Sequence, residues 1–196
     1  MYKIVSTWSS FARPVHEQYP FLLAEMFAYC LGAAHAELAH QTARSFMVSD
    51  AYTGNMEGWR YIDNLPKDKV CGGYTEEQVP NVLHFCQRYG MGKYFFGKRK
   101  LPKNFLTCES PLLREPPTDV LQKYQFAIYP GRNKKTWSPQ MAQRNAFVVC
   151  VMLPVLNAAA THFKDAHCTG NNMTNYDKSL IFFDSIEISA KELAMK

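Results

Sequence analysis

Apolar residues recur at helical spacing between residues 20 and 44. They follow one another at steps of three and four, behind Pro20, a residue suited to the first turn of a helix. The sequence therefore predicts a helix over residues 20–44. Its small residues at 32–34 would form a face that allows a neighbouring helix to approach closely.

A second helical pattern begins near residue 138. Ser138 is a favourable capping residue, and Pro139 is tolerated in the first turn of a helix. The pattern predicts a helix that runs to about Cys168. Pro154 removes one backbone hydrogen bond from it, so we expect a kink there.

Strand patterns are short and few. Residues 79–85 predict a strand, and residues 59–62 predict a short strand or a turn. Glycines punctuate residues 90–97 and predict a loop, and a short helix is expected to end at Tyr124. A further strand is expected over residues 181–188. The expected fold class is therefore α/β, rich in helix, with few short strands.

Composition places the chain among ordinary globular proteins. Apolar residues make up 47% and charged residues 20% of its 196 residues, which excludes extensive disorder. No run reaches the roughly 18 apolar residues that a membrane span needs, so none is expected. The net charge of +5 is modest and spread along the chain, so it does not favour nucleic acid as a partner.

The six cysteines are widely spaced, and none forms a Cys-x-x-Cys pair, which argues against a zinc ribbon. Their number fits one to three disulfides in a secreted domain, and the sequon at Asn172 points the same way. The alternative is free cysteines in a cytosolic core. No signal peptide opens the sequence, so a secretory chain would have lost an N-terminal part.

A basic window without Asp or Glu extends from Gln78 to Cys108. Glycines between its cations would let backbone amides approach an anion, and phosphate is the anion that such sites usually bind. His84 ends the predicted strand, where a neutral imidazole can ligate a divalent cation. The window predicts a metal–diphosphate site, with His84 on the metal and a lysine of the window on the diphosphate. The alternative is a core histidine beside a solvated basic face.

Two further residues are candidates. Glu25 is the only charge between Glu17 and Glu37, and a carboxylate on an apolar helix face is often functional. A helix edge facing solvent would explain it equally well. Trp59 could stack on a sugar ring, or it could fill the core.

Several segments resemble plant and algal glycosyltransferases, the group of hydroxyproline O-arabinosyltransferases and peptidyl serine α-galactosyltransferases. The resemblance rests on a Glu-Met-aromatic-x-aromatic helix, here Glu25-Met26-Phe27-Ala28-Tyr29, and covers roughly residues 18–170. Later segments follow in a similar order: Met47-Val48-Ser49, Leu83-His84-Phe85-Cys86, Phe95-Phe96-Gly97-Lys98 and Cys108-Glu109-Ser110-Pro111-Leu112-Leu113.

The resemblance implies a retaining transferase that moves a sugar from a UDP-sugar to a hydroxyl of a protein acceptor, such as hydroxyproline or serine. It further implies Mn²⁺, the lumen of the Golgi or endoplasmic reticulum, and a GT-A-like nucleotide-diphospho-sugar fold. In that scheme His84 is the late metal ligand, Lys93 or Lys98 contacts the diphosphate, and Glu25 lies near the acceptor or the reacting carbon.

The family's Asp-x-Asp and nucleotide-binding strands lie upstream of the matching segments, and this sequence contains neither. The resemblance therefore implies the C-terminal part of a transferase domain over residues 1–170, followed by a polar tail with a short strand or helix over residues 171–196. Two other functions stay open. One is a non-catalytic anion-binding module, which would bind nucleic acid or polysaccharide through the basic window and residues 131–135. The other is a disulfide-held structural domain without a site.

Overall fold

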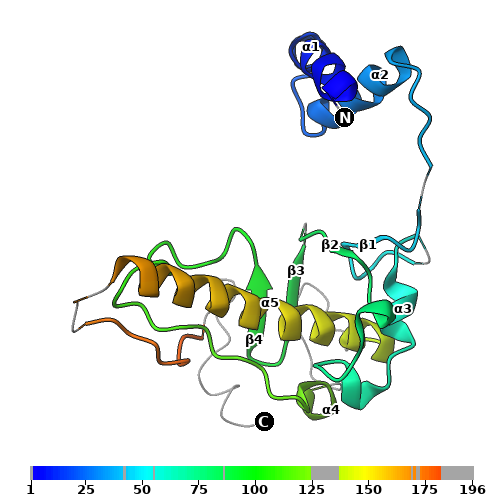
Figure 1. Ribbon diagram of the computed structural model, residues 1–196. Coiled ribbons are helices and arrows are strands. Elements are labelled where there is room, and N and C mark those ends of the chain that lie inside the picture. Colours follow the sequence, from blue (N-terminus) through cyan, green and yellow to red (C-terminus); the bar gives the residue numbers. More distant parts are fainter. Residues whose placement is uncertain are drawn as a thin grey trace. The chain divides into compact units, whose positions relative to one another are not determined.

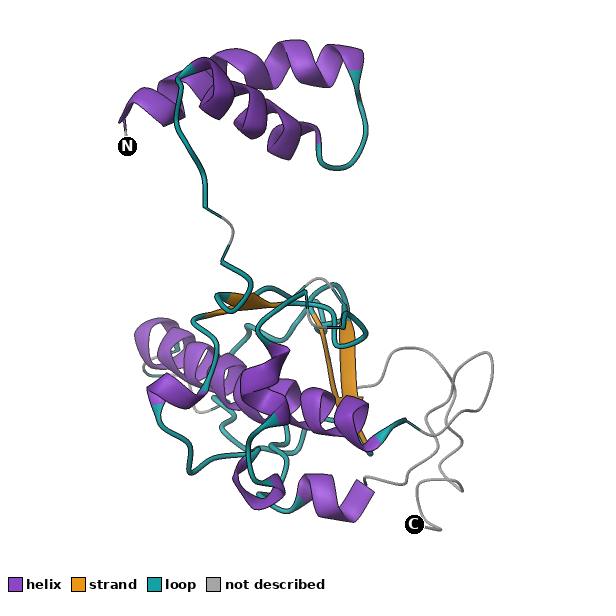
Figure 2. Cartoon of the chain, turned by 90° about the vertical axis from the view of Figure 1, so that its right-hand side faces the viewer, coloured by secondary structure: helices purple, strands orange, loops and turns teal. Residues whose placement is uncertain are grey.

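The structure is a computed structural model of residues 1–196. It describes residues 2–41, 43–54, 56–85, 87–124, 137–168, 170 and 173–181. The chain forms two compact units, Met1–Ala43 and Arg44–Lys196 (Figure 1). This division falls between Ala43 and Arg44, whereas the sequence analysis divided the chain after residue 170. Among the described residues helices predominate and strands are short (Figure 2).

The first unit is a pair of helices, α1 (Tyr2–Gln18) and α2 (Ala24–His35). They pack through the predicted small-residue face, which is confirmed: a Cβ added to Gly32 would lie 3.0 Å from the backbone N and Cα of Trp8. Helix α1 was not anticipated from the sequence. Its serines, threonine and internal proline favour helix weakly, so it relies on packing against α2.

The predicted bounds of the second helix, 20–44, are wrong at both ends. Leu23 has a φ of 82°, and the helix begins after it. At the other end Glu37 adopts a left-handed φ of 55°. The Glu37 and Leu38 amides then donate to the carbonyls of Ala34 and Ala33, at 3.0 and 2.9 Å. This pair of bonds is a Schellman closure, and it ends the helix nine residues early.

The second unit is organised around α5 (Pro139–His167), which packs against α3, α4, β3 and β4. The predicted start is confirmed, because Ser138 Oγ accepts a hydrogen bond from the Met141 amide at 3.2 Å. The helix continues through Pro154 to His167. It is also the one helix among the described residues that is long and apolar enough to cross a membrane, and 44% of its most apolar window is buried within the protein.

Short helices surround α5. They are α3 (Trp59–Asp63), the 3-10 turns η1 (Lys67–Lys69) and η2 (Glu76–Gln78), and α4 (Val120–Tyr124). The strand or turn expected at 59–62 is wrong, since Trp59 and Ile62 are buried one helical turn apart on α3. The short helix expected to end at Tyr124 is confirmed.

Four short strands form two separate pairs. β1 (Met47–Val48) and β2 (Val82–Leu83) are parallel, so only two residues of the strand expected over 79–85 are in a sheet. β3 (Arg88–Met91) and β4 (Tyr94–Gly97) form an antiparallel hairpin, and the loop expected at 90–97 is wrong. The hairpin buries two directly paired sets of side chains: Tyr89 with Phe96, and Met91 with Tyr94.

Two disulfides join loops to α5. Cys71 bonds to Cys150, and Cys108 bonds to Cys168 just past the end of the helix. This confirms the expectation of one to three disulfides, while the secreted compartment stays a prediction. Cys30 is free and exposed. Cys86, Asn172, residues 131–135 and residues 182–188 lie outside the described part of the chain.

Candidate functional site

The carboxyl ends of β1 and β2 meet at one edge of their sheet. The strands are parallel with Val48 opposite Leu83, and the His84 amide donates to the Val48 carbonyl at 2.9 Å. Ser49 and Asp50 follow β1, and His84 follows β2, so all three flank the same edge. In parallel sheets this is the edge where ligands commonly bind. His84 is exposed there, and its side chain is not part of the core.

A set of hydrogen bonds fixes the β1 side of this edge. The Ser49 amide and hydroxyl both donate to the Glu57 carboxylate, each at 2.5 Å. The Tyr89 hydroxyl donates to the Ser49 carbonyl from the neighbouring hairpin. Asp50 Oδ1 accepts from the Tyr52 amide at 2.9 Å, which folds the chain into a turn directly after the edge. The backbone on which the edge residues stand is therefore held by partners from two elements.

The open end of the β3–β4 hairpin adjoins this edge. Arg88 pairs with Gly97, so Lys98 directly follows the last pair of the hairpin and is exposed. The chain from His84 enters the hairpin at the same end, and the rings of Phe85 and Phe96 contact each other at 5.1 Å between centroids. We call the two exposed residues that flank this end of the hairpin, His84 before β3 and Lys98 after β4, the open-end site.

Lys93 belongs to the opposite end of the hairpin. It occupies the turn between β3 and β4, five residues before Lys98. At roughly 3.3 Å per strand residue this separation corresponds to about 16 Å along the hairpin. Of the two lysines that the sequence offered as phosphate contacts, Lys98 therefore lies at the end of the hairpin that the chain enters from His84, and Lys93 lies at the other end.

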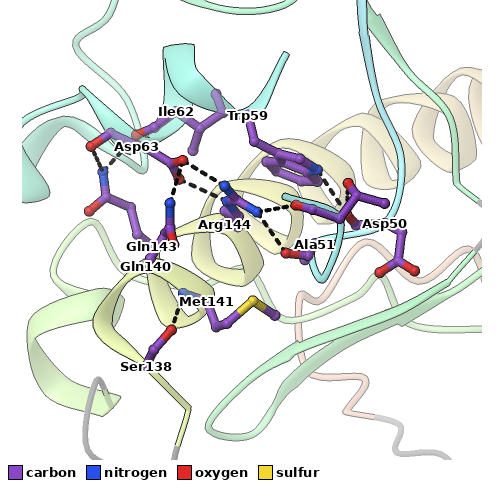
Figure 3. A network of polar contacts seen from close by, with 11 residues as sticks. Asp50, Ala51, Trp59, Ile62, Asp63, Ser138, Gln140, Met141, Gln143 and Arg144 are labelled. Atoms are coloured by element: carbon purple, nitrogen blue, oxygen red, sulfur yellow. Dashed lines mark hydrogen bonds and ion pairs between the residues drawn. The ribbon is translucent and has the colours of Figure 1, made fainter. Parts of the chain in front are cut away.

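A buried polar network anchors the loop that carries Asp50 to α5 (Figure 3). Arg144 is 3% exposed and forms a two-bond ion pair with Asp63, at 2.8 and 2.6 Å. Its Nη1 donates to the carbonyls of Ala51 and Thr53, at 2.9 and 2.7 Å. Sequence reasoning missed this arginine, although a cation one turn inside an apolar helix is a signal of a buried partner.

Trp59 and Glu25 do not belong to the open-end site. Trp59 is completely buried; its indole nitrogen donates to the Asp50 carbonyl at 2.8 Å, and the Arg144 guanidinium lies 5.3 Å from its ring (Figure 3). It has no ring face open to a sugar and fills the core, the alternative reading of the sequence. Glu25 is exposed in the first turn of α2, in the other unit of the chain.

The described residues do not build a complete metal centre. No group of three His, Cys, Asp or Glu side chains within them is arranged to hold a metal ion. His84 is exposed and can provide one imidazole ligand, which is too few for a divalent cation. Any Mn²⁺ bound at His84 would need its remaining ligands from a donor diphosphate or from another chain segment.

Comparison of the chain with protein-family models, with curated proteins and with solved structures finds no match.

Proposed function

We propose that the chain is the C-terminal part of a glycosyltransferase that moves a sugar from a UDP-sugar to a protein hydroxyl, such as that of hydroxyproline or serine. The single observation that carries the proposal is the open-end site. His84, which matches the family's late metal ligand, and Lys98, one of the two lysines that match its phosphate contact, are both exposed and flank the open end of one hairpin.

In this proposal Lys98 neutralises charge that develops on the departing diphosphate. Stabilisation of a leaving group by a fixed cation is usually a large part of catalysis. His84 supplies one imidazole to the Mn²⁺ that the resemblance implies. The GT-A-like fold, the acceptor contact of Glu25 and the lumen of the Golgi or endoplasmic reticulum are parts of the same proposal. The two disulfides support the lumen, since disulfides persist in oxidising compartments.

The proposal is tested by titrating the chain with UDP in the presence and absence of Mn²⁺, followed by NMR. Paramagnetic broadening should appear at the His84 ring and at Lys98 only when both components are present. His84→Ala should abolish the broadening. Lys98→Met should weaken UDP binding by tenfold or more, because a hydrogen bond to a charged group contributes about 1.5–3 kcal/mol.

Lys67→Met is the matched control, since Lys67 is an exposed lysine of η1. It should leave the titration unchanged, and all three variants should keep the melting temperature of the parent within a few degrees. Broadening centred on residues other than His84, or UDP binding that survives both His84→Ala and Lys98→Met, would contradict the proposal.

A further inference from the structure

We propose that the turn end of the β3–β4 hairpin is a second anion site, where Lys93, Arg114 and Lys123 bind a phosphate or sulfate group independently of His84 and Lys98. The shared chemistry of the ligand is a doubly charged tetrahedral oxyanion. This inference does not depend on the proposed transferase function, because it rests on side chains at the opposite end of the hairpin.

Two tyrosines in contact each have a lysine beside them. The rings of Tyr94 and Tyr124 meet edge to face, with centroids 6.4 Å apart. The Lys93 ammonium lies 5.8 Å from the Tyr94 ring, and the Lys123 ammonium lies 5.8 Å from the Tyr124 ring. Cation–π contacts of this kind hold a charge in place without neutralising it. The ring pair therefore carries a cation on each of its members.

Arg114 joins the group from the extended segment beside the hairpin. Its backbone amide donates to the Leu180 carbonyl at 2.9 Å, which fixes its position. Arg114 and Lys93 line one small hollow of about 10 Å³, whose floor includes Leu113 and Leu153. A hollow of this size admits about one water molecule, so an oxyanion would lie at its mouth, beside the two cations that line it.

The turn between β3 and β4 packs tightly against α4. Gly92 has a φ of 59°, a left-handed conformation that favours glycine. A Cβ at this position would lie 2.6 Å from the Tyr124 ring, so the turn packs directly on α4. This close approach brings the Lys93 side of the hairpin to the helix that carries Lys123. The cations therefore come from three segments that the fold holds together.

The charges at the turn are not balanced within the described residues. None of the ion pairs there includes Lys93, Arg114 or Lys123. Burial lowers the pKa of Lys93, and the charges of Arg114 and Lys123 lower it further. Burial raises the pKa of Tyr94 and the Asp119 charge raises it slightly further, so Asp119 lies near this group and offsets one of its three positive charges. A net charge of about two favours a doubly charged anion over chloride or acetate.

The test is a titration of the whole chain with inorganic phosphate and, separately, with sulfate at low ionic strength, followed through the side-chain NMR signals of lysine and arginine. Lys93, Arg114 and Lys123 should shift together with a single saturating Kd, and acetate should bind at least tenfold more weakly. Bound oxyanion should also raise the pKa of Lys93. If only sulfate saturates the site, its ligand is a sulfate ester. If only phosphate saturates the site, its ligand is a phosphate ester.

Lys93→Met and Arg114→Met should each weaken phosphate binding by tenfold or more while the amide spectrum shows an intact fold. Lys67→Met and His84→Ala should not change it. Non-saturating shifts spread over the other surface lysines would overturn the proposal. So would loss of binding in His84→Ala, which would place the anion at the open-end site. Because Mn²⁺ and UDP report on His84, either proposal can fail while the other stands.

Discussion

The two units of the chain are stabilised in different ways. Helices α1 and α2 meet through backbone contact at Gly32, and their described cysteine, Cys30, is unpaired. The unit around α5 has a broad apolar core, two disulfides and several buried polar side chains. The first unit also leaves large apolar side chains exposed, including Leu22 at 81% and Met26 at 56%. The first unit is therefore held by the close approach at Gly32 and a few exposed contacts, such as the hydrogen bond from the Trp8 indole to the Glu25 carbonyl, whereas the second unit has a buried core.

The second unit contains little sheet, and buried polar side chains of α5 provide hydrogen-bond partners for the backbone of its loops. Asn157 exchanges two hydrogen bonds with the backbone of Leu113, each 2.7 Å long. Lys164 is 1% exposed and donates to the carbonyls of Thr107, Cys108 and Ser110. Buried backbone groups need partners, and these segments have few from strands. In the second unit α5 supplies them from its side chains.

Reduction of the disulfides should produce the largest difference between the units. Each bridge closes a long loop, with sequence separations of 79 and 60 residues, and chain-entropy estimates give about 4 kcal/mol for loops of this size. Denaturant unfolding with and without reductant, resolved by hydrogen exchange, should show the loss in the second unit alone. A partner for Cys150 other than Cys71 in peptide mapping would contradict the structure.

The next largest effect should come from the ion pair between Arg144 and Asp63. Removing one partner of a buried pair leaves an uncompensated charge, so Arg144→Met should lower the free energy of unfolding by about 3–5 kcal/mol. Asp63→Leu combined with Arg144→Met should cost less than the sum of the two single changes. Urea unfolding of the four proteins measures this coupling, and strict additivity would show that the pair is not coupled.

In the first unit Gly32→Val should cost about 1–3 kcal/mol, as overpacking of a tight contact does. The added side chain meets backbone atoms of α1, which cannot rotate away. Hydrogen exchange of α1 amides should accelerate while that of α5 stays unchanged. Gly54→Ala is the control, because nothing lies within 4 Å of the Cβ it would add. Equal protection in both variants would show that the contact at Gly32 does not hold α1.

The parts of the fold that the sequence predicted are those with local signals. Ser138 and Pro139 identify the start of α5, and the small residues at 32–34 identify the face that meets α1. The sequence does not predict the hairpin β3–β4, because Gly90, Gly92 and Gly97 interrupt its alternation and are typical of loops. Its strands are specified by the burial of paired side chains, which is a tertiary property.

The candidate site shows the same limit. The local pattern predicts His84 at a strand end, but only the hairpin register decides that Lys98 lies at the end where the chain enters and Lys93 at the turn. Arg114 and Lys123 were absent from the sequence-based site because they lie 21 and 30 positions beyond Lys93. Trp59 was a candidate because aromatic residues serve cores and sugar sites alike, and only burial distinguishes the two.

The smallest expected effect is an acid-dependent loosening of the second unit at Glu115. Burial raises the pKa of Glu115, but hydrogen bonds from Lys178 and Asn157 outweigh it and leave the pKa below its ordinary value. A carboxylate with a lower pKa in the folded than in the unfolded state stabilises the fold above the unfolded pKa of about 4.3, and this stabilisation is lost as the pH falls through the folded value. Glu115→Gln should remove that dependence, which hydrogen exchange at Leu113 and a pH series of unfolding curves measure. In the first unit Arg13→Gln should change little, because its pair with Glu17 is exposed. An acid response of equal size in both units would mean that general charge repulsion, and not the Glu115 contacts, controls it.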